Sequence, residues 1–65
     1  MTIKELLSLC ENVDDYTEVL LYDTLRDYKN NTPNWKTYTA NQLYNSSAKV
    51  ATFKLHKYFI AIALA

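Results

Sequence analysis

Apolar residues at the start of the chain repeat with the period of a helix. They fall at spacings i, i+3, i+4 and i+7, which place them on one face of an α-helix. Thr2 opens the segment and Glu5 follows three residues later, which is the pattern of a capping box. The sequence therefore predicts a helix from about residue 2 to residue 10. The face that it buries consists of Ile3, Leu6, Leu7 and Cys10.

After a break of turn-forming residues at 11–16, the pattern of side chains changes to a period of two residues. Residues 17–22 alternate between two sides, which is typical of a β-strand, and Asp23 ends the run. One side carries Thr17, Val19 and Leu21, and the other carries Glu18, Leu20 and Tyr22.

The middle of the chain is harder to interpret. Leu25 and Tyr28 fit a helical turn or an irregular strand, and residues 30–34, with Pro33, indicate a loop. Residues 35–38 favour a short strand. Thr39 with Gln42 repeats the capping-box pattern and predicts a second short helix.

Residues 48–65 allow two interpretations. A long helix from residue 40 would place apolar residues at spacings of three and four, but the basic residues would then be scattered around it. A hairpin turning near His56 and Lys57 segregates the side chains better. Its second strand is apolar on both faces, with large residues on one and alanines on the other. The uncharged run 58–65 is too short to span a membrane, which takes about 20 residues.

These elements predict an α+β fold, in which two short helices pack on a small, mainly antiparallel sheet with a C-terminal hairpin. A strand that is apolar on both faces has to be covered on both sides. If both helices cover one face, the alanine face needs another chain. We therefore expect a homo-oligomer, with a homodimer as the simplest case. The expected self-association residues are Ala61, Ala63 and Ala65.

Length and charge limit the classes of protein to which this chain can belong. Sixty-five residues make a single domain, residues 1–65, of marginal stability. The formal net charge is zero, but all seven carboxylates lie in the first 27 residues, while residues 28–65 carry only lysines as charged groups. The two halves either pair their charges across the fold or form a bipolar surface for association. One unpaired cysteine and no signal peptide predict a cytoplasmic protein.

The composition argues against catalysis and against cofactors. The chain has no glycine, so it has no phosphate-binding loop of the P-loop or dinucleotide type. Cys10 and His56 are the only residues of their kinds, which excludes a zinc site of the Cys/His type within one chain. We expect no catalytic residues and no metal. Aromatic and basic residues interleave at 53–59, as in base-stacking strands, but the zero net charge argues against nucleic acid.

Tyrosine is the residue type that stands out. Six tyrosines and one tryptophan are many for so small a core, and these residues dominate the hot spots of protein interfaces. They either wrap the thin core or form a recognition surface around the irregular middle segment. The expected partner-binding residues are Tyr22, Tyr28, Trp35 and Tyr38.

The first 23 residues, TIKELLSLCENVDDYTEVLLYD after Met1, and the closing KVATFKLHKYFIAIAL resemble a known pattern. It is the pattern of short accessory proteins encoded by phages and mobile elements of Gram-positive bacteria. The resemblance implies a non-enzymatic protein in the host cytoplasm that binds and inhibits a host protein, such as a component of bacterial immunity in the manner of anti-CRISPR proteins. An oligomeric protein that sequesters a nucleotide-like small ligand is the alternative.

Overall fold

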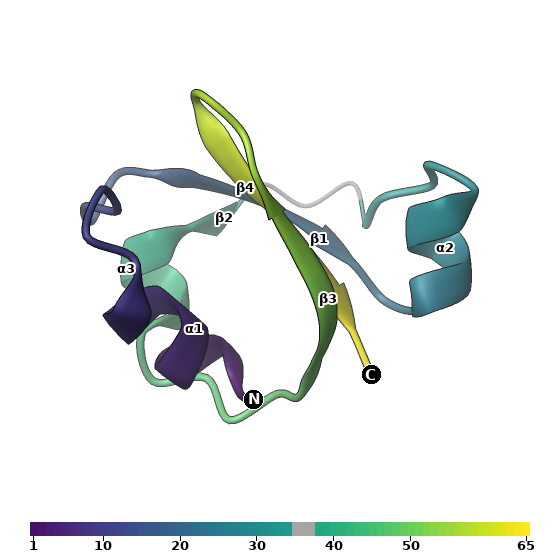
Figure 1. The fold of residues 1–65 in the computed structure, drawn as a ribbon, viewed down its shortest axis with the longest axis horizontal. Helices are drawn as coiled ribbons and strands as arrows, with labels where there is room; N and C mark the ends of the chain where they lie inside the picture. The colour runs from purple at the N-terminus through teal and green to yellow at the C-terminus, as the bar shows by residue number, and fades with distance from the viewer. Residues whose placement is uncertain (35–37) are drawn as a thin grey trace.

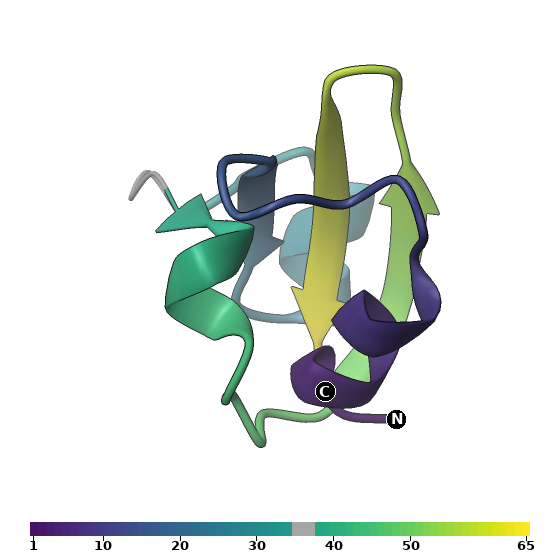
Figure 2. The same cartoon turned by 90° about the vertical axis from the view of Figure 1, so that its left-hand side faces the viewer.

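The computed structural model describes residues 1–34 and 38–65, and it has three layers (Figure 1). A four-stranded sheet lies in the middle, with two helices on one face and one helix on the other (Figures 1 and 2). The helices are α1 (Ile3–Leu9), α2 (Leu25–Lys29) and α3 (Ala40–Leu43). The strands are β1 (Glu18–Tyr22), β2 (Tyr38–Thr39), β3 (Val50–Leu55) and β4 (Phe59–Leu64). This confirms the α+β fold.

The two helices expected from capping boxes are present, and they lie on the same face. The backbone N–H of Glu5 donates to Thr2 Oγ1 over 3.2 Å, and the Thr2 N–H donates to Glu5 Oε1 over 3.1 Å. In the second helix the Thr39 N–H donates to Gln42 Oε1 over 3.0 Å. These bonds satisfy N–H groups that a helix start leaves unpaired.

The strands are arranged in the order β2-β1-β4-β3. The two outer pairs are antiparallel, and the central pair of β1 with β4 is parallel, with Leu21 opposite Ile62. The expected hairpin of β3 and β4 is present, which excludes the long helix. Since β1 and β4 are far apart in sequence, the segment between them has to cross over, and it carries α2, β2, α3 and β3.

The main core lies between the sheet and the helices α1 and α3. The alternation predicted for β1 is confirmed, because Val19 and Leu21 point into this core together with Ile60 and Ile62 of β4. None of the helices in the described part of the chain is long and apolar enough to cross a bilayer. The buried members of this core are Ile3, Leu6, Leu7, Val19, Leu21, Ala40, Leu43, Ile60 and Ile62.

A second, smaller core lies on the other face of the sheet, under α2. Ala61 and Ala63 are 3% and 0% exposed, because Tyr22 and Tyr28 cover them. Alanine side chains leave room for the tyrosine rings, so a helix with no fully buried residue of its own can close this face. The premise that a single chain leaves the alanine face uncovered is therefore wrong. Among the expected self-association residues only Ala65 is exposed.

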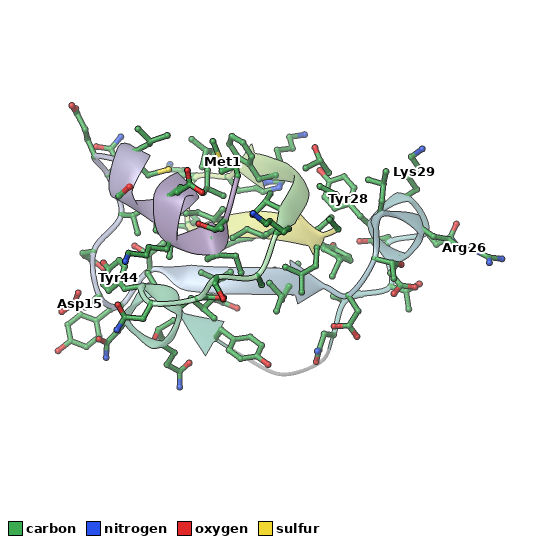
Figure 3. The ribbon with its side chains drawn as sticks, turned by 90° about the horizontal axis from the view of Figure 1, so that it is seen from below. Met1, Asp15, Arg26, Tyr28, Lys29 and Tyr44 are labelled. Atoms are coloured by element: carbon green, nitrogen blue, oxygen red, sulfur yellow. The ribbon has the colours of Figure 1, made fainter. Side chains whose placement is uncertain are left out.

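Helix α2 resolves the ambiguity of the middle segment. Its N-cap is Thr24, whose Oγ1 accepts the N–H of Asp27 over 3.0 Å. The Thr24-to-Asp27 spacing was a signal in the sequence for this helix start. Figure 3 shows Tyr28 on the side of α2 toward the sheet, while Arg26 and Lys29 extend away from it. The helix therefore contributes one large side chain to the second core.

Candidate functional site

An open groove lies beside the tip of the β3–β4 hairpin. Its volume is about 830 Å³. One wall is the loop between α1 and β1, which passes across the sheet in Figure 2, and the other wall is the hairpin end, which projects beyond the helices. The lining residues are Leu9, Cys10, Glu11, Asn12, Val13, Asp14, Tyr16, Thr17, Leu55, His56, Lys57, Tyr58, Phe59 and Ile60.

Hydrogen bonds shape the loop wall of the groove. Asp14 Oδ1 accepts the N–H of Tyr16 over 2.9 Å and the hydroxyl of Thr17 over 3.2 Å. The Asp15 carbonyl accepts the N–H of Asn41 over 3.1 Å, which ties the loop to α3. With the backbone fixed in this way, the Tyr16 side chain extends into solvent.

A second contact holds the base of the same loop. The Asp15 carboxylate lies beside the Tyr44 hydroxyl, and Figure 3 shows the two side chains next to each other. Partial burial raises the pKa of the Tyr44 phenol, and the charge of Asp15 and its hydrogen bond raise it further. The loop is therefore anchored to α3 through backbone and side chain.

Large apolar side chains stand exposed around the groove. Leu9, Leu55 and Tyr58 are 69%, 57% and 78% exposed, and the half-buried Cys10 and Val13 lie between them and the main core. Leu9 belongs to α1 but lies outside its predicted apolar face. Such an off-face leucine was the signal in the sequence for this surface, which is absent from the expected site residues.

The hairpin tip has ordered aromatic contacts. The His56 ring stacks on Phe59 with centroids 4.2 Å apart and planes at 10°, and Lys57 Nζ lies 5.3 Å from the centre of the Tyr58 ring. Phe59 packs against the second core, while Cys10 packs against the main core on the opposite face. His56 is thus held by Phe59 of the second core, although its side chain also lines the groove together with Cys10.

The two walls of the groove carry opposite charge. Glu11 and Asp14 lie in the loop wall, whereas Lys57 lies in the hairpin wall. The groove therefore has acidic side chains on one wall and a basic side chain on the other, a charge arrangement that is called its bipolar rim below. Within the described residues, no three Cys, His, Asp or Glu side chains lie together in a group that could hold a metal ion.

The expected recognition tyrosines do not share one surface. Tyr22 and Tyr28 belong to the second core, and Tyr38 packs against the main core on the opposite face of the sheet. Tyr22 is only 5% exposed. Trp35 lies outside the described residues. Among the three expected residues that the structure describes, only Tyr22 and Tyr28 are therefore brought together.

Tyr22 and Tyr28 instead line a second, smaller pocket of about 340 Å³ under α2. Asn31 adopts a positive φ of 53°, which asparagine tolerates, and its Oδ1 accepts the Tyr22 hydroxyl over 3.1 Å. The lining combines aromatic rings with basic side chains. It consists of Leu20, Tyr22, Tyr28, Asn31, Lys54, His56, Phe59 and Ala61.

Comparisons of this chain with family profiles, with curated proteins and with solved structures find no significant match. The two concave surfaces are therefore interpreted from their own chemistry.

Proposed function

We propose that the protein acts by binding another protein in the groove beside the hairpin tip, without catalysis. The observation that carries this proposal is the set of exposed apolar side chains contributed by three separate segments around one groove. Each of three side chains is more than half exposed, namely Leu9 of α1, Leu55 of β3 and Tyr58 of the hairpin turn. Exposed apolar groups that gather in one place and carry a charged rim are typical of protein interfaces.

The partner that we propose is a host protein, which the small protein inhibits. The resemblance of the sequence to accessory proteins of phages and mobile elements supports this choice. The bipolar rim supports a partner with a complementary pair of acidic and basic patches, since opposed charges orient two proteins as they meet. Tyr58 would act as the anchor, because tyrosine combines a large apolar area with a polar end.

Affinity capture from a lysate of a Gram-positive bacterium, followed by binding measurements with the purified partner, tests this proposal. Leu9→Gln and Tyr58→Ser each remove one apolar group from the rim. We expect either change to weaken binding by about 10-fold or more, as for central interface residues.

Leu25→Gln is the matched control. Leu25 is 39% exposed on α2, which lies on the opposite face of the sheet from α1, so its replacement should leave binding unchanged. Groove variants that bind the partner as tightly as the unchanged protein would refute the proposal. Equal weakening by Leu25→Gln would show that the effect does not come from the groove.

A second candidate function is the sequestration of a small planar anion in the pocket under α2. Its aromatic side chains can stack on a planar ring, and the side chains of Lys54 and His56 can bind a negatively charged group. Calorimetric titration with adenosine monophosphate as the probe tests it. Lys54→Gln should then abolish binding and Lys49→Gln should not, because Lys49 does not line the pocket. No heat of binding at millimolar probe would exclude this function.

A further inference from the structure

Strand β3 forms one edge of the sheet, and most of its outer side is open. Only its beginning is covered, because the Met1 carbonyl accepts the N–H of Val50 over 2.8 Å and Thr2 forms a bridge to Lys49. From Ala51 to Leu55, no strand in the described part of the chain pairs with this side. An open edge of this kind is a template for another strand.

The register of the hairpin determines which backbone groups face outward. The His56 N–H donates to the Phe59 carbonyl over 2.9 Å, so this pair is a hydrogen-bonded one. Bonded and non-bonded pairs alternate along an antiparallel ladder. Leu55 opposite Ile60 and Phe53 opposite Ile62 are therefore non-bonded pairs. The N–H and C=O groups of Phe53 and Leu55 consequently point away from β4, toward the open edge.

The side chains at this edge are apolar and accessible. Phe53 and Leu55 are 41% and 57% exposed, although both lie on the face of the sheet that α1 covers further in. They are exposed because β3 is at the edge of the sheet and its end projects beyond the helices (Figure 2). The segment 51–55 contains no proline and one lysine, so few of the usual edge-blocking features are present.

We infer that β3 pairs in antiparallel fashion with β3 of a second copy of this chain, with Phe53 on the two-fold axis. In this register Phe53 lies opposite Phe53 of the second copy, and Leu55 lies opposite the β-bulge between Val50 and Thr52, where the regular ladder ends. On the other face Thr52 lies opposite Lys54. The outward-facing N–H and C=O groups of Phe53 then meet their equivalents in the second copy, and the two Phe53 side chains meet on the axis.

Other registers are worse. If the register shifts by one residue, the outward-facing N–H and C=O groups of one copy lie opposite residues whose N–H and C=O groups are already hydrogen-bonded to β4. A shift toward the hairpin places Lys54 opposite Lys54 of the second copy, which is a repulsive pair. A shift the other way extends the ladder to Val50, whose N–H is already bonded to Met1. Lys54 therefore selects the register rather than preventing the pairing.

Thr52 provides a test that leaves both pockets unchanged, since it lines neither of them, and native circular dichroism of its variants checks the fold. Sedimentation equilibrium up to about 300 µM should show a reversible monomer–dimer equilibrium for the unchanged protein. Thr52→Glu places a carboxylate opposite Lys54 at two symmetric positions, so the dimer should tighten by about 2- to 30-fold. Thr52→Lys should weaken it by a similar factor, and added salt should reduce both effects.

The inference does not depend on the proposed partner binding. An unchanged protein that stays monomeric throughout this concentration range would overturn it. A dimer that responds equally to Thr52→Glu and Thr52→Lys would also overturn it, because the strands would then meet elsewhere. Phe53→Lys, checked for native circular dichroism, is the second variant, and it should give a monomer because it places two like charges on the axis.

Discussion

The ring of Tyr28 meets the ring of Tyr22 edge to face, with centroids 5.1 Å apart and planes at 83°. Tyr28 belongs to α2, and Tyr22 is the last residue of β1. No residue of α2 is fully buried, so this contact is the main apolar attachment of the helix to the sheet. It also closes the face on which Ala61 and Ala63 lie.

Tyr28→Ala should therefore detach α2 while the main core stays folded. Loss of an edge-to-face pair together with partial burial predicts a decrease in the free energy of unfolding of about 1–3 kcal/mol. Hydrogen exchange of the amides at 25–29 should accelerate more than that of β1. Tyr28→Phe is the control, because it keeps the ring, and it should preserve most of the stability. Uniform acceleration across all strands would show that α2 is not a separate unit.

Leu7→Asp should prevent folding. Leu7 is 3% exposed in the main core, and an unpaired charge buried there costs several kcal/mol, which a domain of this size cannot offset. Leu9→Asp puts the same charge two residues later, where the side chain is 69% exposed, and should fold. Circular dichroism and thermal melting distinguish the two. A native spectrum for Leu7→Asp would contradict the helix register.

The capping box of α1 should make stability depend on pH. Hydrogen bonds from the Thr2 backbone and side chain lower the pKa of Glu5 from its ordinary value of 4.5, and the positive N-terminus and Lys49 lower it further. Because the pKa of Glu5 is lower in the folded than in the unfolded protein, the ionised carboxylate stabilises the fold at pH values above its ordinary pKa. This contribution disappears as the pH falls through the pKa of the folded state.

Glu5→Gln keeps a hydrogen-bonding side chain without the charge. Its melting temperature should be lower than that of the unchanged protein at about pH 7, and the difference should shrink at about pH 3. Glu11→Gln is the control, because Glu11 is an exposed carboxylate outside the helix. A difference for Glu5→Gln that is independent of pH would show that the charge does not contribute.

Local patterns predicted most of the fold. Thr2 with Glu5 and Thr39 with Gln42 located two helix starts, because a capping box is formed within four residues. The alternation in β1 and β4 gave the correct faces, since side chains along a strand point to alternate sides. Both signals are contained in short stretches of chain.

Long-range arrangement was the part that the sequence did not determine. The parallel pairing of β1 with β4 and the placement of α2 opposite α1 depend on how the crossover folds back. A helix with only Leu25 and Tyr28 as apolar residues gives a weak periodic signal. The exposure of Leu55 likewise follows from the edge position of β3 and not from its own alternation. The candidate groove could not be predicted from the sequence, because the exposure of Leu55 depends on the position of β3 in the sheet.

The buried alanines give the sharpest test of the two-sided core. Ala63 is fully covered beneath the tyrosines of the second core, whereas Ala65, just beyond the end of β4, is exposed. Ala63→Lys should therefore prevent folding, because the side chain is too large for the site and its charge would be unpaired. Ala65→Lys should fold with a melting temperature within a few degrees of the unchanged protein. If the alanine face were instead an interface between copies, Ala63→Lys would give a folded monomer. Circular dichroism combined with sedimentation separates these outcomes, since an unfolded chain and a folded monomer differ in both measurements.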